Sequence, residues 1–200
     1  MTQFERMMAE LPYFGDDEIR SRMMNTRKLV FAYNSLAPEE VEKKQQILKK
    51  LLGKTGEKFY IESPFRCDYG CNVELGENFY ANYNLTILDC NKVVFGDDVL
   101  VAPNVTITAA GHLVHPDSRK KYEYGISVKI GNRVWLGANV VVCPGVTIGD
   151  GSVIGAGSVV TKDIPENVIA FGNPCKVYRQ ITDEDREFYY KDRKFDVKDY

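Results

Sequence analysis

Two histidines, His112 and His115, are the residues of this sequence best suited to move a proton near neutral pH. Both lie in the range 108–129, which also carries a basic cluster at 119–121. An imidazole beside a hydroxyl can act as the general base that activates the oxygen for attack. No serine, cysteine or aspartate stands in a nucleophile motif such as G-x-S-x-G. The sequence therefore favours direct attack on a substrate over a covalent enzyme intermediate.

The five cysteines indicate neither a metal site nor a disulfide framework. Cys67 and Cys71 lack the Cys-x-x-Cys spacing of a zinc site, and the chain has only two histidines to complete a cluster. An odd number of cysteines, in a chain whose N-terminal residues form no apolar export segment, is typical of free thiols in a reducing compartment. We therefore expect a cytoplasmic protein that needs no metal ion.

The composition is that of an ordinary globular chain. Its 200 residues include 26 Lys and Arg against 28 Asp and Glu, which gives a formal net charge of −2. This balance provides no general attraction to nucleic acid or anionic lipid. No window contains the roughly 20 apolar residues that a membrane span requires. We expect neither nucleic acid nor a membrane among the partners.

From about residue 60 onward, aliphatic residues recur every six positions. The unbroken series is Ile130, Leu136, Val142, Ile148, Ile154 and Val160; the same frame occurs at Leu75, Ala81 and Ile87, slips by two residues near Lys92, and resumes at Phe95, Val101 and Ile107. A period of six matches neither a helix nor an alternating strand, and it predicts a parallel β-helix of hexapeptide repeats. Each short strand of such a coil directs one aliphatic side chain into a narrow interior, where its burial contributes about 1.5–3 kcal/mol.

The sequence divides into three segments. Residues 1–57 show helical periodicity, with acidic residues at a helix start, and predict a helical segment packed on the main domain. Residues 58–180 hold the repeats and are interrupted by the loop 108–129, whose length is typical of a functional excursion. Residues 181–200 are expected to form a C-terminal helix or a tail.

An ordered set of motifs carries a resemblance to a known family. The motifs are FRCDYG at 65–70, NFYAN at 78–82, APNVT at 102–106, GH at 111–112, GNRVW at 131–135, PGVTIGD at 144–150, IGAGSVVTKD at 154–163 and GNPC at 172–175. With the helical N-terminus, this set resembles the hexapeptide-repeat O-acetyltransferases that acetylate maltose, galactosides and related sugars. The resemblance extends to about Arg179 and thus covers nearly the whole chain.

The resemblance implies a left-handed parallel β-helix that assembles as a homotrimer, with active sites between neighbouring subunits. It implies an acetyl-CoA-dependent O-acetyltransferase that moves acetyl to the hydroxyl of a maltose-, glucose- or galactoside-type sugar by direct attack. The family's Gly-His position matches Gly111-His112, so His112 is the expected general base and His115 a supporting or surface residue. Many relatives have proline after the catalytic histidine, whereas Leu113 follows His112 here and Pro116 follows His115.

The same resemblance implies contacts for both substrates. The expected acetyl-CoA contacts are Asn82, Ala138, Ala156, Thr161, Lys162, Lys176 and Arg179. A backbone N–H near Ala138 is expected to hold the developing oxyanion. The expected acceptor contacts are Asp68, Asp89 and Asp16, with Asp17 as the alternative to Asp16. Asp68 resembles the maltose branch and residues 80–86 the galactoside branch, so the resemblance does not name the acceptor.

Two other interpretations keep the same fold. One is an acyltransferase for a non-sugar acceptor, such as an antibiotic, an amino sugar or an amino acid, and the other is a non-catalytic β-helix scaffold. A scaffold requires neither His112 nor the cations Lys162, Lys176 and Arg179, so these residues favour an enzyme. A γ-type carbonic anhydrase needs three zinc-binding histidines, and this chain has two.

Overall fold

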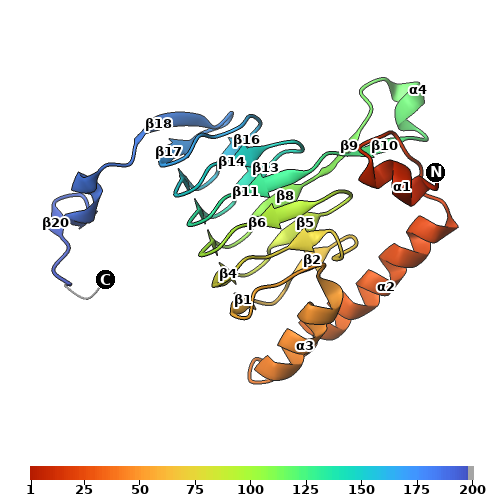
Figure 1. Ribbon diagram of the computed structural model, residues 1–200, viewed down its shortest axis with the longest axis horizontal. Coiled ribbons are helices and arrows are strands. Elements are labelled where there is room, and N and C mark those ends of the chain that lie inside the picture. The colour runs from red at the N-terminus through yellow and green to blue at the C-terminus, as the bar shows by residue number, and fades with distance from the viewer. Residues whose placement is uncertain (198–200) are drawn as a thin grey trace.

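The structure is a computed structural model that describes residues 1–197. Three N-terminal helices precede a parallel β-helix, a hairpin projects from the β-helix, and a C-terminal segment leaves it at the far end (Figure 1). The fold class is the one that the sequence predicts: mainly β, with a helical N-terminal segment and a protruding loop.

Three sheets form the walls of the β-helix, and successive strands of the chain visit them in turn. The first sheet contains β1 (Phe59–Ile61), β4 (Phe79–Ala81), β7 (Leu100–Val101), β12 (Trp135–Leu136), β15 (Val153–Ile154), β17 (Val168–Phe171) and β18 (Lys176–Gln180). The second contains β2 (Arg66–Cys67), β5 (Thr86–Leu88), β8 (Thr106–Thr108), β13 (Val141–Val142) and β16 (Val159–Val160). The third contains β3 (Val73–Glu74), β6 (Val93–Phe95), β11 (Val128–Ile130) and β14 (Thr147–Ile148). Neighbouring strands are parallel, except that β18 runs antiparallel to β17.

The strand register stacks the hexapeptide residues into three columns. The columns are Ala81, Val101, Leu136, Ile154 and Ala170; Ile87, Ile107, Val142 and Val160; and Phe95, Ile130, Ile148 and Ile164. None of these side chains is more than 5% exposed. The six-residue period is therefore confirmed as the spacing of inward-facing side chains, because each repeat supplies one member of a column.

The slip of the repeat near Lys92 has a structural origin. The turns 68–72 and 89–92 both connect the second sheet to the third, and each makes its repeat eight residues long, from Cys67 to Leu75 and from Ile87 to Phe95, against six from Val142 to Ile148. They hold buried polar side chains, among them Asn72 and Asp89. The Asn72 amide donates to the carbonyl oxygen of Asp89 at 2.8 Å, so these two turns are joined to each other inside the protein.

The N-terminal helices are α1 (Gln3–Met8), α2 (Asp17–Asn34) and α3 (Val41–Leu51). Helices α2 and α3 cover the first coil of the β-helix, since Tyr33, Leu48 and Leu51 belong to the same buried core as Phe65. The amide of Asn34 donates to the carbonyl of Phe65 at 2.8 Å and accepts its N–H at 2.9 Å. The hydrophobic interior is thereby closed at its N-terminal end, where the chain would otherwise expose an unpaired sheet edge.

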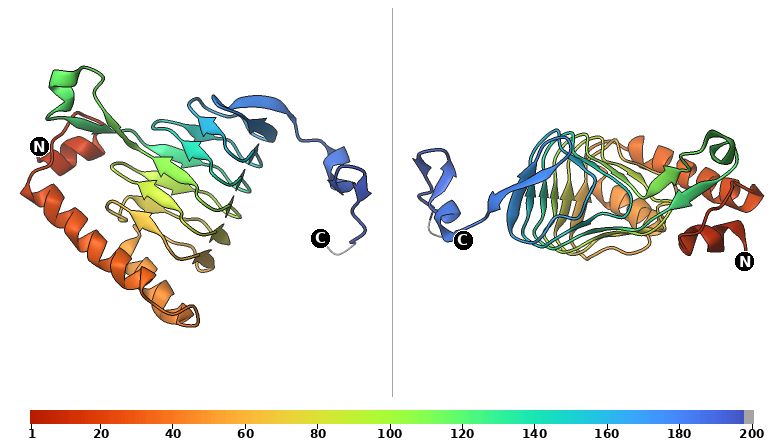
Figure 2. Two further views of the ribbon diagram at one scale, coloured as in Figure 1. Left: turned by 180° about the vertical axis from the view of Figure 1, so that it is seen from behind. Right: turned by 90° about the horizontal axis from the view of Figure 1, so that it is seen from above.

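The loop 108–129 forms a hairpin between β8 and β11. Its strands β9 (Ala110–His112) and β10 (Glu123–Gly125) are antiparallel, and the short helix α4 (Pro116–Arg119) lies between them. The hairpin projects beside α1 in both views (Figures 1 and 2), and β10 contacts that helix. The excursion is therefore ordered and is packed against the N-terminus.

The C-terminal segment contains a 3-10 turn, η1 (Asp183–Arg186), and a two-stranded antiparallel ribbon of β19 (Phe188–Tyr190) and β20 (Arg193–Lys194). It runs away from the β-helix after β18 (Figure 2). The range 181–200 was expected to be a helix or a tail; over 181–197 it takes this third form, and residues 198–200 lie outside the described part.

Candidate active site

The candidate residues gather on two edges of the β-helix. The first edge consists of the turns that follow the first sheet and lead to the second, at 62–65, 82–85, 102–105, 137–140 and 155–158. The second edge consists of the turns that follow the second sheet, at 68–72, 89–92, 109–127, 143–146 and 161–163. Stacking places equivalent turns of successive coils above one another. Side chains far apart in sequence therefore share an edge.

His112 ends β9 on the second edge and is exposed. Its imidazole makes no hydrogen bond or ion pair within residues 1–197. Gly111 precedes it, and a Cβ at that position would come within 2.4 Å of the end of the Tyr124 ring, so a larger residue there would require that ring to move. The hairpin therefore presents a free imidazole, which is the arrangement that a general base requires.

His115 has a local structural role instead. It is the N-cap of α4, and its Nδ1 accepts the backbone N–H of Asp117 at 3.3 Å. The Asp117 carboxylate lies 4.0 Å from the same nitrogen. These contacts agree with the supporting position expected for His115.

Asp89 and Asp68 occupy neighbouring turns of the second edge but differ in accessibility. Asp89 is fully buried, and its Oδ1 accepts the backbone N–H groups of Asp68 at 2.9 Å and Tyr69 at 3.0 Å. Its Oδ2 is buried without a hydrogen-bond partner in the described chain. Burial raises the pKa of Asp89 to about 7, against the effect of the two N–H donors. The geometry thus makes Asp89 a support for the turn that presents Asp68.

Asp68 lines a hollow of about 610 Å³ between α2 and the second sheet, together with Arg27 and Arg66. Burial raises the pKa of its carboxyl, Arg27 opposes that effect, and Glu123 adds to it. The Glu123 carboxylate acts electrostatically on the Asp68 carboxyl, and Glu123 is the β10 residue opposite His112. The hairpin that carries His112 therefore lies close to Asp68. Asp68 can therefore reach a ligand on the second edge.

The first edge carries Asn82, Ala138 and Ala156. The Asn82 Oδ1 accepts the N–H of Tyr83 at 2.7 Å, which leaves its amide N–H groups available. The Ala138 carbonyl accepts the N–H of Gly157 at 2.8 Å, so the turns of Ala138 and Ala156 are stacked directly. These compact side chains leave an open surface along the edge.

The backbone around Ala138 offers a donor on this edge. The N–H groups of Gly137 and Asn139 are bonded to Ile154 O at 2.8 Å and Pro103 O at 3.0 Å. The N–H of Ala138, between them, has no partner in residues 1–197. A free N–H beside two fixed ones is a preorganised donor for a developing oxyanion.

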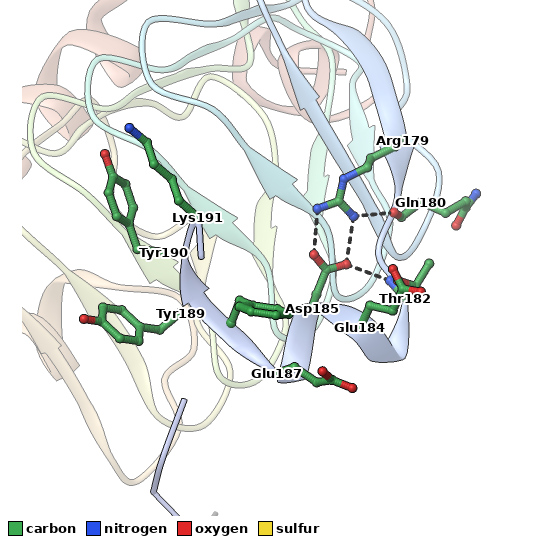
Figure 3. A pocket seen from close by; sticks show the side chains of 10 residues that line it. Arg179, Gln180, Thr182, Glu184, Asp185, Glu187, Tyr189, Tyr190 and Lys191 are labelled. Carbon is green, nitrogen blue, oxygen red and sulfur yellow. Dashed lines mark hydrogen bonds and ion pairs between the residues drawn. The ribbon is translucent and has the colours of Figure 1, made fainter. Parts of the chain in front are cut away.

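Thr161 and the three expected cations lie at the C-terminal end of the β-helix. Thr161 and Lys162 are exposed on the second edge just after β16, and Lys176 is exposed on β18. Arg179, also on β18, forms a two-pronged ion pair with Asp185, at 2.6 Å to Oδ1 and 2.8 Å to Oδ2. Figure 3 shows this pair on the wall of a hollow of about 880 Å³ in the C-terminal segment. The Arg179 guanidinium lowers the pKa of Asp185 to about 2, so the pair is charged at neutral pH.

Asp16 is occupied by the start of α2. Its Oδ1 accepts the N–H of Ile19 at 2.9 Å and caps the helix, and the residue is half-buried. Asp17 points to solvent and lies 3.5 Å from Arg20. The N-cap bond therefore fixes Asp16, whereas Asp17 has only an exposed partner.

One chain does not bring all of these residues together. His112, Asp68, Thr161 and Lys162 are on the second edge, whereas Asn82, Ala138 and Ala156 are on the first. The strands of the second sheet separate the two edges within a chain.

Two residues beside His112 were not among the sequence candidates. Glu123 lies directly across from His112 in the β9–β10 pair, and Tyr13 donates its hydroxyl to the Glu123 carboxylate at 3.2 Å. The sequence places Glu123 in the excursion but gives no strand register, and 110 residues separate it from Tyr13. The strand pairing of the hairpin identifies Glu123, and the contact of the hairpin with the N-terminus identifies Tyr13.

Other kinds of site find little support in the described chain. Residues 1–197 contain no group of three or more His, Cys, Asp or Glu side chains arranged to hold a metal ion. The five cysteines are free thiols. Among the same residues, no helix is both long and apolar enough to cross a bilayer.

Two family models match the chain. "Bacterial transferase hexapeptide (six repeats)" matches residues 127–162, and "Maltose acetyltransferase hexapeptide capping motif" matches residues 6–56. The second match covers the helices that close the β-helix, and the first covers coils that carry both edges.

Full-length relatives are similar as well. A galactoside O-acetyltransferase from Escherichia coli (strain K12) is 49% identical over 174 residues, or 86% of each chain. A galactoside acetyltransferase solved in complex with coenzyme A superposes with a TM-score of 0.95 at 45% identity, covering 98% of this chain and 100% of that one. A maltose O-acetyltransferase from Clostridium difficile 630 superposes with a TM-score of 0.90 at 45% identity, covering 92% and 99%.

Proposed function

This chain belongs to the hexapeptide-repeat O-acetyltransferase family of the maltose and galactoside type, and on that premise we propose that it transfers acetyl from acetyl-CoA to a sugar hydroxyl. The observation that carries the proposal is the superposition, over 98% of the chain, on a galactoside acetyltransferase in complex with coenzyme A. The acceptor class follows the names of these relatives, which are galactoside and maltose enzymes. The proposed location is the cytoplasm.

His112 is the proposed general base. It removes the proton of the acceptor hydroxyl as the oxygen attacks the thioester carbonyl carbon, and a tetrahedral intermediate forms. When the carbon–sulfur bond breaks, the protonated imidazole returns the proton to the departing thiolate, which leaves as coenzyme A. The free ring of His112 supports this role, whereas His115 is occupied as the α4 cap.

The first edge would stabilise the negative charge on the thioester oxygen. The free N–H of Ala138 is the proposed donor, and the amide of Asn82 lies on the same edge as a second donor. Donors that are fixed before the reaction stabilise an oxyanion without reorganisation. The small side chains of Ala138 and Ala156 leave room for the pantetheine arm.

The active site is proposed to lie between copies in a homotrimer. The base is on the second edge and the oxyanion donor on the first, so a complete site needs the first edge of one copy against the second edge of the next. Such a head-to-tail contact uses two different surfaces of each subunit and closes into a ring when the rotation allows it. Three copies would give three equivalent sites.

The proposed contacts of the two substrates follow from the edge on which each residue lies and from its charge. Asp68 is the proposed acceptor contact on the second edge, Asp89 acts by fixing its turn, and Asp16 contributes through the start of α2. Thr161, Lys162, Lys176 and Arg179 are the proposed contacts of the pantetheine and the phosphorylated nucleotide of acetyl-CoA. The three cations among them are exposed and would attract its phosphates.

A thiol-release assay tests this proposal. Purified protein is incubated with acetyl-CoA and a panel of glucose, maltose, galactosides and non-sugar acceptors, and free coenzyme A is measured. Release that depends on a sugar is the expected result. Release only with an amino sugar, an amino acid or an antibiotic would contradict the sugar assignment, and no release with any acceptor would support the scaffold alternative.

A further inference from the structure

The hairpin that carries His112 is held by a segment from the other end of the chain. We call residues 3–14 the N-terminal strap. The N–H of Tyr13 in this strap donates to the Glu123 carbonyl at 3.0 Å, and the Glu123 N–H donates to the Tyr13 carbonyl at 2.9 Å. The Tyr13 hydroxyl donates to Glu123 Oε2 at 3.2 Å. Three hydrogen bonds thus join the same two residues, and Tyr13 extends the β9–β10 pair by an isolated bridge.

A second small core anchors the strap. Met7 and Tyr13 are buried with Tyr69 and Cys90 of the second edge, and Ala110 of β9 packs against them. This cluster is distinct from the main core inside the β-helix. The strap, the second edge and the hairpin therefore meet in one apolar contact.

Asn91 links the strap and the hairpin by polar contacts. Its buried amide donates to the Met7 carbonyl at 2.8 Å and to the Gly125 carbonyl at 3.1 Å. Two residues beyond the same end of β10, the Ser127 hydroxyl and N–H both donate to the Glu10 carboxylate, at 2.9 and 3.1 Å. The chain on the C-terminal side of Glu123 is thus held at two points, Gly125 and Ser127.

Glu123 connects the N-terminal strap to the candidate active site. It is the register partner of His112, and side chains directly opposite in an antiparallel pair share one face, with Cβ atoms about 4.5–5.5 Å apart. The groups that face Glu123 are the Tyr13 hydroxyl on the strap and Asp68, Tyr69 and Cys90 on the second edge. Burial raises the pKa of Tyr13, so its hydroxyl keeps its proton and remains a donor to the carboxylate.

We propose that Tyr13 is a positioning residue: its hydroxyl fixes the Glu123 carboxylate on the face of the β9–β10 pair that carries His112, and so sets the charge that the base meets there during the reaction. This inference rests on the proposed function. Packing alone does not need the hydroxyl, since phenylalanine at position 13 would keep both backbone bonds and the buried ring. The hydrogen bond from the Tyr13 hydroxyl sets the direction of the Glu123 carboxylate, and Glu123 is the residue directly opposite His112 in the strand register.

The test compares Tyr13→Phe with Tyr122→Phe in the intact enzyme. Tyr122 is the matched control, because it is one residue from Glu123 and its ring contacts Phe14 of the strap edge-on. Tyr13→Phe is expected to lower kcat about 3- to 10-fold, with the acetyl-CoA KM within two-fold of wild type. Tyr122→Phe is expected to change neither.

A double-variant cycle shows whether Tyr13 acts through Glu123. In a Glu123→Ala background, Tyr13→Phe should cost no further activity, because the group that it positions is gone. Equal losses from Tyr13→Phe in both backgrounds, or wild-type kcat in Tyr13→Phe, would overturn the proposal.

A second readout does not depend on turnover. The protein has two histidines, so ring-nitrogen NMR can follow His112 with His115 as internal reference. Tyr13→Phe and Glu123→Ala should both change the ring tautomer population of His112 and leave that of His115 unchanged. An unchanged His112 spectrum in both folded variants would contradict the positioning role. An inactive wild type whose His112 spectrum responds would instead count against the proposed function alone.

Discussion

The buried carboxylate of Asp89 accepts the backbone N–H of Asp68 at 2.9 Å, so one acid in the interior fixes the turn that presents another. The same Asp89 oxygen accepts the N–H of Tyr69 at 3.0 Å. Its second oxygen is the atom left without a hydrogen-bond partner among residues 1–197. A proton on that oxygen removes the charge that burial disfavours, which is why the pKa of Asp89 is raised to about 7.

Replacement of Asp89 by asparagine should therefore alter how stability depends on pH. An aspartate in the unfolded chain has a pKa of about 3.9. Between about pH 4 and 7 the folded protein holds a proton that the unfolded chain releases, so the free energy of unfolding falls as pH rises, by at most about 1.4 kcal/mol per unit. Asp89→Asn keeps the acceptor for both N–H groups and stays neutral. Its free energy of unfolding should lack this decline.

Urea denaturation at pH 5, 6, 7 and 8 measures the difference. Asp150→Asn is the control, because hydrogen bonds from Asn132 lower the pKa of Asp150. The stabilisation that the Asp150 carboxylate provides is lost only as pH falls below about 4, so this variant should leave the slope above pH 5 unchanged. Equal slopes for wild type and Asp89→Asn would show that Asp89 is ionised in the folded protein.

The hexapeptide columns could be predicted from the sequence because the rule behind them is local. Each coil must place one aliphatic side chain inward and then turn, so Leu136, Val142 and Ile148 reveal the fold by their spacing. The turn residues obey a local rule too. Asn84, Asn104 and Asn139 have positive φ, a conformation that asparagine tolerates better than most residues.

The surroundings of His112 could not be predicted in the same way. The contact of Tyr13 with Glu123 depends on packing of the N-terminus against the hairpin, and nothing in either segment indicates the other. In the sequence, Asp89 and Asp68 are equally plausible acceptor contacts. The structure separates them, because Asp89 is buried and Asp68 is accessible. Such roles are set by tertiary contacts and not by residue type.

Arg179 should contribute to acetyl-CoA binding and not to turnover. Its guanidinium is held by Asp185 with good geometry, so it presents its remaining N–H donors in a fixed orientation on β18. Arg179→Ala is expected to raise the acetyl-CoA KM about 10-fold with kcat unchanged, because charge-assisted contacts with phosphate are strong. Lys176→Ala should have a smaller effect, since an ammonium makes no two-pronged contact. Steady-state kinetics with varied acetyl-CoA would show this, and an unchanged KM in Arg179→Ala would remove the residue from the site.

The division of the site between two edges can be tested by mixing subunits. His112→Ala and Asn82→Ala each disable one edge, so each homotrimer should lose most of its activity. A trimer that contains both variants has one interface where the intact second edge meets the intact first edge, which predicts about one third of wild-type activity. The two variants are co-expressed with different tags, and mixed trimers are purified over both. Mixed trimers as inactive as the parents would place the whole site within one chain.

The central claim is that the His112 imidazole is the base for acetyl transfer to an acceptor hydroxyl. The most direct measurement is kcat of His112→Ala beside His115→Asn, which keeps a side chain able to cap α4, together with the acetyl-CoA Kd of each. The account predicts that His112→Ala lowers kcat at least about 100-fold with an unchanged Kd, and that His115→Asn remains close to wild type. Near-normal turnover in a folded His112→Ala variant would contradict it.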